Sequence, residues 1–307
     1  MGFFGKLFGK NTDEIKVEPD RKERTVIDYK TVFQGLSRNA IKLNIDTSSN
    51  APVTVGVSKF GGQPDLPAGF QWPYYRYTDN KDTEHSKPLA FLLQINCGEL
   101  ADYDADRLLP ETGMLYFFYE LETMTWGFDP KDKGSARVYY YDTDSLVRQP
   151  FPSDLLLEFC MPEFPVSFTV KNDLPDYEEC AENYQTDAND YEEYAEQRKD
   201  FGYVEEESDR TKLLGYANII QNDMLRECEH ATNGIYCGDA SVKLSEDQRR
   251  AFSENCKQWK LLLQMDTVYK ENFELMFGDA GHIYYYIRES DLADKNFDNC
   301  WLILQCY

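Results

Sequence analysis

The three histidines are the first residues to consider for chemistry, because imidazole is a common general base and a frequent metal ligand. His85, His230 and His282 are spread widely along the 307-residue chain. Cys228 and Cys237 flank His230 in a C-x-H-x₆-C spacing, which is not a standard zinc pattern and offers no clear fourth ligand. The sequence therefore predicts neither a metal site nor a bound cofactor.

Two Gly-rich stretches are the next candidates for chemistry. Asp279 and His282 lie in "GDAGH", at the start of an expected strand, where an Asp–His pair can do acid–base work. The alternative is an aspartate that caps its own turn beside a histidine that only begins the strand. Neither this stretch nor "KFGG" at Lys59 has the glycine spacing of a phosphate-binding loop. Because no catalytic arrangement is complete, the sequence leans away from an enzyme.

The elements that must position these residues are mainly short strands and turns. The stretch "SKFGGQPDLPAGFQWP" at 58–73 is rich in glycine and proline, so it cannot form a helix or a central strand. We predict that it is a structural corner, with Trp72 at the edge of the core. Ser245 and the acidic residues after it predict a helix start. Apolar and aromatic runs predict strands within 88–100, 112–122, 136–147, the downstream part of 245–267, 275–288 and 298–307.

Three sequence blocks occur twice in the same order, which indicates an internal duplication. The matched pairs are "SKFGGQPD" (58–65) with "TKLLGYAN" (211–218), "FLLQIN" (91–96) with "LLLQMD" (261–266), and "TGMLYFFYE" (112–120) with "AGHIYYYIR" (280–288). Each half has too few strands to be stable alone. We therefore expect halves at about 53–150 and 211–307 to pair around one shared core with a pseudo-twofold relation.

The duplication matches Lys59 with Lys212. If the two halves bring these cations together, they can hold an anionic group, whereas the alternative is a pair of structural salt bridges. Together with Trp72, Asp279 and His282, they are the candidate ligand-binding residues of a site between the repeats.

Three glutamines end apolar runs, at Gln94, Gln264 and Gln305. A glutamine in an apolar strand is costly unless it is hydrogen-bonded. We predict that these side chains bond across strands and fix the shared core.

Composition limits the class of partner. The net charge of −23 opposes binding to nucleic acid and favours basic proteins, cationic peptides or divalent cations. The alternative is that the acidity only keeps the protein soluble. Eight cysteines without a C-x-x-C pair, no signal-peptide core and no long apolar run predict a reduced, cytoplasmic protein without a transmembrane segment.

Residues 173–210 form an acidic insert, with fifteen acidic and three basic residues. Tyr177, Tyr184, Tyr191 and Tyr194 follow a helical spacing and predict one aromatic stripe among carboxylates. These tyrosines are candidate partner-binding residues that would dock a basic protein. The alternative is a solvated helix that its tyrosines pin to the body of the protein.

Residues 1–24 comprise a short amphipathic basic tip, "MGFFGKLFGK", and a charged linker. The tip can make a weak membrane-surface contact or dock on a partner. The alternative is a helical turn that packs on its own domain or frays.

Over residues 25–307 the chain resembles the YwqG-like proteins, a bacterial family of unknown function. The resemblance rests on Ser58-Lys59-Phe60-Gly61-Gly62 through Trp72-Pro73, on "PLAFLLQIN", "LPETGMLYFFY" and "KLLGY…IQND", and above all on "GDAGHIYYYIRESDLADKNFDNCWLILQCY". It implies a cytoplasmic α+β protein with a duplicated core and a role in immunity to polymorphic toxins, but no activity.

We therefore predict an α+β fold, mainly antiparallel β with peripheral helices, built from two intertwined duplicated halves that share one core. The predicted function is that of a non-enzymatic binding protein whose acidic surface engages another protein, as an immunity factor against a toxin would. The alternative function is that of an enzyme or small-molecule-binding protein with a site between the two repeats.

Overall fold

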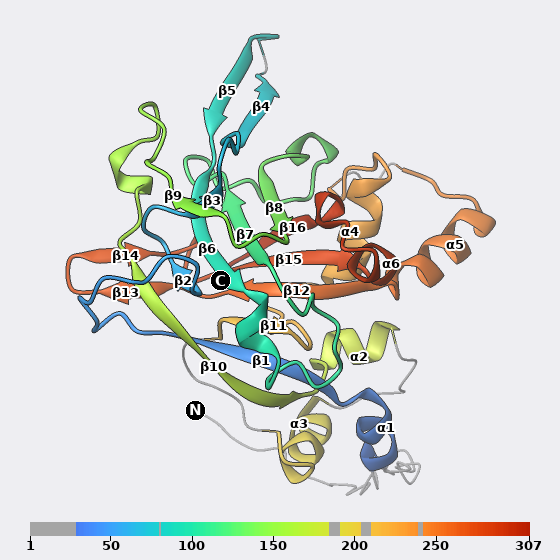
Figure 1. Cartoon of the computed structure of the whole chain (residues 1–307). Helices are drawn as coiled ribbons and strands as arrows, with labels where there is room; N and C mark the ends of the chain where they lie inside the picture. The colour runs from blue at the N-terminus through green and yellow to red at the C-terminus, as the bar shows by residue number, and fades with distance from the viewer. Residues whose placement is uncertain (1–28, 80, 184–190, 204–209, 239–241) are drawn as a thin grey trace, which may run out of the picture.

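The computed structural model describes residues 29–79, 81–183, 191–203, 210–238 and 242–307. The predicted N-terminal tip and linker at 1–24 lie outside these ranges. The fold is α+β, with antiparallel strands predominating and short helices around them, as predicted (Figure 1). The described helices are α1 (Tyr29–Leu36), α2 (Tyr177–Asn183), α3 (Tyr191–Asp200), α4 (Met224–Thr232), α5 (Glu246–Cys256) and α6 (Glu289–Ala293).

The described strands are β1 (Arg38–Ile45), β2 (Lys59–Phe60), β3 (Asp65–Pro67), β4 (Tyr74–Thr78), β5 (Glu84–Pro88), β6 (Ala90–Asn96), β7 (Met114–Tyr119), β8 (Ala136–Tyr141), β9 (Leu146–Arg148), β10 (Phe164–Asp173), β11 (Lys212–Leu214), β12 (Trp259–Met265), β13 (Val268–Lys270), β14 (Phe273–Leu275), β15 (His282–Arg288) and β16 (Trp301–Gln305). Strands β6, β7, β8, β12, β15 and β16 lie within the predicted apolar and aromatic runs, whereas the two longest strands, β1 and β10, were not predicted. The predicted helix start at Ser245 is confirmed, because its side chain and that of Gln248 form a capping box on α5.

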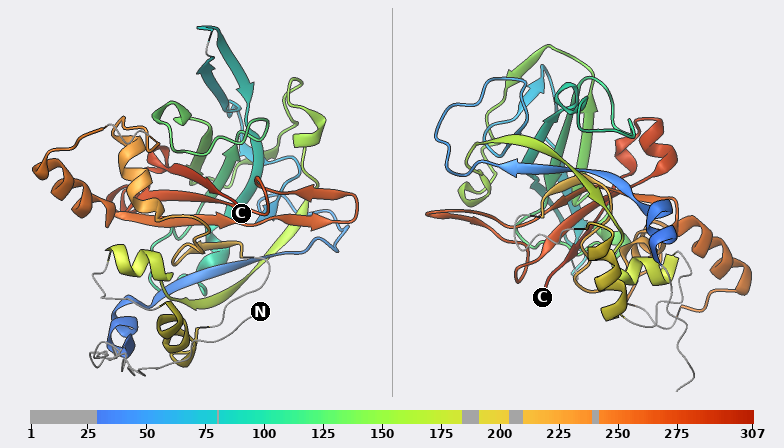
Figure 2. Two further views of the ribbon diagram at one scale, coloured as in Figure 1. Left: turned by 180° about the vertical axis from the view of Figure 1, so that it is seen from behind. Right: turned by 90° about the horizontal axis from the view of Figure 1, so that it is seen from below.

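Ten of the described strands form one sheet in the order β16-β15-β12-β11-β1-β10-β2-β6-β7-β8. This order is a palindrome of equivalent strands: β11 corresponds to β2, β12 to β6, β15 to β7 and β16 to β8. In Figure 1 the teal and green strands β6 and β7 run steeply, whereas the orange and red strands β12 and β15 run nearly level. Figure 2 shows the long strands β1 and β10 joining the two groups.

The register of the central strands shows where the pseudo-twofold axis lies. Lys42 of β1 pairs with the first residue of β11, and Pro165 of β10 pairs with the first residue of β2. Lys42 and Pro165 are therefore equivalent, and so are the residues two positions further along, Asn44 and Ser167. Asn44 and Ser167 pair with each other, so the axis passes between them. The structural repeat thus includes β1 and β10, upstream of the matched sequence blocks.

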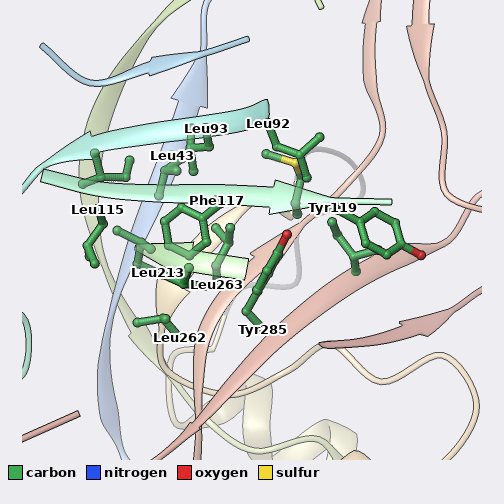
Figure 3. Close-up of a cluster of buried hydrophobic side chains, with 14 of the residues drawn as sticks. Leu43, Leu92, Leu93, Leu115, Phe117, Tyr119, Leu213, Leu262, Leu263 and Tyr285 are labelled. Atoms are coloured by element: carbon green, nitrogen blue, oxygen red, sulfur yellow. The ribbon is translucent and has the colours of Figure 1, made fainter. Parts of the chain in front are cut away.

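The shared core lies where the two halves of the sheet face each other. Phe117 of β7 and Tyr285 of β15 are equivalent residues, and their rings meet edge to face with centroids 5.3 Å apart (Figure 3). The Tyr285 hydroxyl donates a hydrogen bond to the carbonyl of Phe118 at 3.0 Å, so this buried phenol has a partner. One leucine in each half, Leu92 and Leu262, sits at a matched β-bulge and is fully buried in the same cluster. A single core therefore joins both copies.

A loop of the first half covers the free edge of the second half's last strand, β16, and the second half packs a ring on the first half's last strand, β8. The backbone N–H of Leu304 in β16 donates to the carbonyl of Trp126, a loop residue of the first half, at 3.1 Å. Phe297 of the second half packs on Tyr140 of β8, with ring centroids 5.8 Å apart. Covered edges do not recruit further strands, which protects a sheet of this length from aggregation. Within the described ranges, no helix is long and apolar enough to span a membrane.

We predict that Gly61→Ala destabilises the protein far more than Gly69→Ala. Both glycines have positive φ, at +59° and +81°. A Cβ at Gly61 would lie 2.2 Å from the carbonyl oxygen of Pro162, whereas a Cβ at Gly69 meets nothing within 4 Å. Leu214, the equivalent of Gly61, has the same φ of +59°, so the backbone contact and not φ alone should decide the difference.

Urea unfolding should show a loss of at least about 3 kcal/mol for Gly61→Ala and of about 1–2 kcal/mol for Gly69→Ala. Equal losses would contradict the close contact between the backbone at Gly61 and the segment before β10.

Candidate functional site

The segment at residues 57–65, which contains β2 and ends at the first residue of β3, is here called the first corner and is held by one buried glutamine. Gln94 of β6 donates from Nε2 to the carbonyl of Val57 at 2.8 Å and accepts at Oε1 from the N–H of Asp65 at 2.9 Å. The Tyr116 hydroxyl donates to the carbonyl of Asp65 at 2.6 Å. These bonds satisfy loop groups that would otherwise be buried without partners.

The segment at residues 210–218, which contains β11 and is here called the second corner, repeats this network. Gln264 of β12 donates from Nε2 to the carbonyl of Arg210 at 2.9 Å and accepts at Oε1 from the N–H of Asn218 at 2.8 Å. The Tyr284 hydroxyl donates to the carbonyl of Asn218 at 2.6 Å. Each residue bonded in the second corner is the sequence equivalent of the residue bonded in the first corner. The match between residues 58–65 and 211–218 is therefore a real structural repeat.

The predicted role of the glutamines in cross-strand bonding is wrong. All three bind the backbone of loops that pack on the strand, because the loops carry more unsatisfied polar groups than neighbouring strands do. Gln305, the third of them, accepts from the N–H groups of Ile220 and Gln221, both at 3.1 Å.

Lys59 and Lys212 do not face each other. Lys59 is fully buried, with Nζ 2.7 Å from Oε2 of Glu163, and Lys212 Nζ lies 2.7 Å from Oδ2 of Asp173. Strands β1 and β10 lie between them in the sheet, which separates the two backbones by about 14 Å. The two lysines therefore form the pair of structural salt bridges that was the alternative prediction, with Glu163 directly before β10 and Asp173 at its last residue. A shared anion site across the pseudo-twofold axis has no geometric basis.

The other candidate ligand-binding residues are also dispersed. Trp72 donates from Nε1 to the carbonyl of Leu89 at 2.9 Å and packs edge to face on Phe118, at the core edge as predicted. Asp279 uses its carbonyl to accept from the N–H of Tyr307 at 3.0 Å and does not pair with His282.

The partner of His282 is Asp266, which is not among the site residues predicted from the sequence. His282 Nδ1 lies 3.1 Å from Asp266 Oδ1, and both side chains are largely buried. Burial alone would raise the pKa of Asp266, but His282 and the N–H groups of Arg210 and Thr267 outweigh it and hold that pKa below its usual value. The N–H of Arg210 donates to Oδ2 of Asp266 at 3.0 Å, so the pair lies next to the start of the second corner.

The two corners share a backbone network but differ in the chemistry of their side chains. At the first corner, Asp65 is fully buried and Arg148 Nε lies 2.9 Å from its Oδ1. Burial would raise the pKa of Asp65, but Arg148, Gln94, the N–H of Gly56 and Lys59 hold it below its usual value. The differences, first corner against second, are Val57 against Arg210, Asp65 against Asn218, Asn96 against Asp266, and Met114 against His282.

A pocket of about 240 Å³ opens at the second corner, between that loop and helices α2 and α3. We call it the second-corner pocket. Its lining residues include three cations, two acids and five tyrosines: Arg198, Lys199, Arg210, Asp176, Glu178, Tyr177, Tyr191, Tyr194, Tyr203 and Tyr307. The pocket was not predictable from the sequence because its walls come from four separate segments.

Three of the candidate partner-binding tyrosines meet at this pocket, and Tyr184 lies outside the described residues. The prediction of one helical stripe is wrong, because Tyr177 begins α2 and Tyr191 begins α3. Their rings nevertheless pack edge to face with centroids 5.7 Å apart. Tyr194 is buried and donates to the carbonyl of Pro175 at 2.7 Å, so it anchors α3, while Tyr191 is 60% exposed.

Arg198 organises the inner wall of the pocket. Its Nη1 donates to Oδ1 of Asp176 at 2.7 Å, and its guanidinium lies 3.7 Å above the ring of Tyr203. The second oxygen of Asp176 accepts from the N–H of Ile219 at 2.7 Å. The charge of Asp176 is thus balanced and both of its oxygens are used.

The fold and the two corners together define a class of protein: a duplicated antiparallel α+β protein with one sealed and one open corner. No grouping of three or more metal-ligating side chains occurs among the described residues, Cys228, His230 and Cys237 included.

A family model described as "Domain of unknown function (DUF1963)" matches residues 58–306. The chain therefore belongs to this family, with which the YwqG-like resemblance agrees. No curated protein matches the chain.

We predict that Lys212→Met destabilises the protein by about 3–5 kcal/mol, because it leaves the buried carboxylate of Asp173 without its cation. Adding Asp173→Asn should recover most of this loss in urea unfolding. The amide keeps an acceptor for the N–H of Tyr216, which now lies 3.0 Å from Oδ2 of Asp173. If the free energy of unfolding of Lys212→Met lay within 0.5 kcal/mol of the parent value, the prediction would be contradicted.

We also predict that stability falls as pH rises from about 5 to 8, through Glu179 of α2. Burial raises the pKa of this carboxyl to about 8; Arg38 opposes the rise, and Asp223, Asp176 and Asp173 add to it. Below about pH 4.5 the carboxyl is protonated in both states, so its burial carries no charge penalty. Above that pH the unfolded chain releases the proton and the folded protein keeps it, so unfolding becomes easier by up to about 1.4 kcal/mol per pH unit.

Thermal unfolding from pH 5 to 8 should show a shallower decline for Glu179→Gln than for the parent. The matched control is Glu178→Gln, which removes the same charge from an exposed neighbour and should leave the slope unchanged. Identical slopes for the parent and Glu179→Gln would contradict the assignment.

Proposed function

We propose that this protein is a non-enzymatic binding protein whose acidic surface engages a basic partner protein. The observation that carries the proposal is the outer edge of the second-corner pocket. There the ring of Tyr191, 60% exposed, lies beside Tyr177 and near the exposed carboxylate of Glu178. We call these three residues the acidic rim.

The acidic rim suits a lysine or arginine side chain. An aromatic face attracts a cation by about 0.5–2 kcal/mol, depending on how much water is removed. The rim also lies in the most acidic part of the chain, where residues 173–210 carry fifteen acidic and three basic residues. Long-range attraction of this kind accelerates association with a basic surface and weakens as salt is added.

The nature of the partner follows from the family resemblance and from the charge. A toxin domain with a cationic patch is one such partner, and covering that patch would neutralise it. A cytoplasmic location is part of the same proposal and rests on the family resemblance.

The test is retention of proteins from the native host on the immobilised protein, with their identity, charge and salt dependence recorded. We expect at least one basic protein to bind the parent at 50 mM salt, with at least tenfold less retained at 300 mM. The variant Glu178→Lys with Tyr191→Ser should lose it.

The matched control is Glu274→Lys with Tyr269→Ser on the β13–β14 hairpin, which removes another exposed tyrosine and a carboxylate paired across the hairpin. This control should retain the partner. Equal retention by both variants, or retention only of acidic proteins, would contradict the proposal.

A further inference from the structure

We infer that the second-corner pocket binds a small organic anion, in which a carboxylate or phosphate group is attached to a planar body. This inference goes beyond the proposed partner binding, because it depends on the inner residues Arg198, Arg210 and Asn218 and not on the acidic rim. It starts from the duplication, which places matched residues on the same backbone network and so exposes where the two copies differ.

The first corner shows what a purely structural copy looks like. Asp65 is sealed under Arg148 and contacts Lys59 Nζ at 3.6 Å, so its charge is compensated within the protein. Val57 occupies the position that corresponds to Arg210. Both Asp65 and Gln94 are fully buried, which leaves no surface for a ligand.

The second corner reverses the charge at the matched positions. Asn218 replaces the carboxylate of Asp65, and Arg210 replaces the apolar side chain of Val57, so the two positions change from one negative to one positive charge. Both Arg210 and Asn218 line the pocket. In a chain with a net charge of −23, a local gain of positive charge at an open corner points to an anionic ligand.

Helix α3 adds two further cations to the same pocket, Arg198 and Lys199. Of the two acids among the described lining residues, the less exposed one, Asp176, has both oxygens engaged by Arg198 and by the N–H of Ile219. Arg198 Nε is buried and makes no hydrogen bond with the described part of the chain. Leaving a buried N–H donor without an acceptor costs free energy, and an anionic oxygen would supply the missing acceptor.

The size and walls of the pocket define the body that carries the anionic group. A volume of about 240 Å³ corresponds to about eight water molecules, which is the room that an aromatic ring with one substituent needs. The rings of Tyr177 and Tyr203 line the walls and favour a planar body.

The test uses three named probes of similar size, measured by calorimetry on the full chain: phenyl phosphate, 4-hydroxybenzoate and neutral benzamide. Inorganic phosphate is a fourth arm. We expect one of the two aromatic anions to bind at least tenfold more tightly than benzamide, and the better one identifies phosphate or carboxylate as the recognised group. Inorganic phosphate alone should bind more weakly than phenyl phosphate.

The duplication supplies the variants. Arg210→Val and Asn218→Asp each install the residue that the first corner carries, so the corner network and the fold should persist, as near-ultraviolet circular dichroism can check. Each should weaken the better anion at least tenfold, whereas Glu274→Lys, on the β13–β14 hairpin and outside the pocket lining, should not weaken it. If Arg210→Val fails to fold, Asn218→Asp alone decides, because its side-chain oxygen still accepts from Gln264 Nε2, now 3.0 Å from Asn218 Oδ1.

Three outcomes would overturn the inference: no anion binds, benzamide binds equally well, or anion binding is unchanged in both variants. The two proposals can fail separately. A variant that loses anion binding but still retains the basic protein affects only this inference, and a variant that loses the basic protein but still binds the anion affects only the proposed function.

Discussion

The antiparallel pairing of β1 with β10 is the contact on which the rest of the fold depends. This pairing extends over eight residue pairs. In addition, β1 of the first half pairs with β11 of the second half, and β10 of the second half pairs with β2 of the first half. Neither half can therefore complete its own sheet. The exchange forces the two copies to fold around one core, and Phe117 and Tyr285 meet there as equivalent residues. A sheet closed in this way gives both corner loops a rigid support.

Each corner then depends on one buried amide. Gln94 and Gln264 bind matched backbone groups at distances that agree within about 0.1 Å. Because the amide satisfies the loop backbone, the side chains of the loop are free to change without loss of the corner. The first copy seals its corner with an ion pair between Asp65 and Arg148. The second copy leaves its corner open to helices α2 and α3, and the pocket lies there.

Local patterns made the duplication and the strands β6, β7, β8, β12, β15 and β16 predictable from the sequence, but not the two longest strands, β1 and β10, whose sequences contain no continuous apolar run. "FLLQIN" and "LLLQMD" form equivalent strands, β6 and β12, because an apolar run of this length suits a buried strand whatever surrounds it. The capped start of α5 at Ser245 was predictable for the same reason, since its signal lies within four residues.

What the sequence could not supply were contacts between distant segments. The counterions of Lys59 and Lys212 are Glu163 and Asp173, at the two ends of β10, and no local pattern links them. His282 at the start of β15 pairs with Asp266, directly after the neighbouring strand β12, and not with Asp279, which is closer in sequence. The pocket needs Arg198 from the insert and Arg210 from just before the matched block, and only the fold brings these together.

The central claim is that one corner is structural and its copy binds a ligand. Hydrogen–deuterium exchange of the backbone amides, with and without phenyl phosphate or 4-hydroxybenzoate, tests it most directly. Without the anion, the amides of Asp65 and Asn218 should both exchange slowly, because each donates to a buried glutamine. With the anion, protection should increase over residues 210–219 and stay constant over 57–66. An increase at both corners, or at neither, would contradict the account.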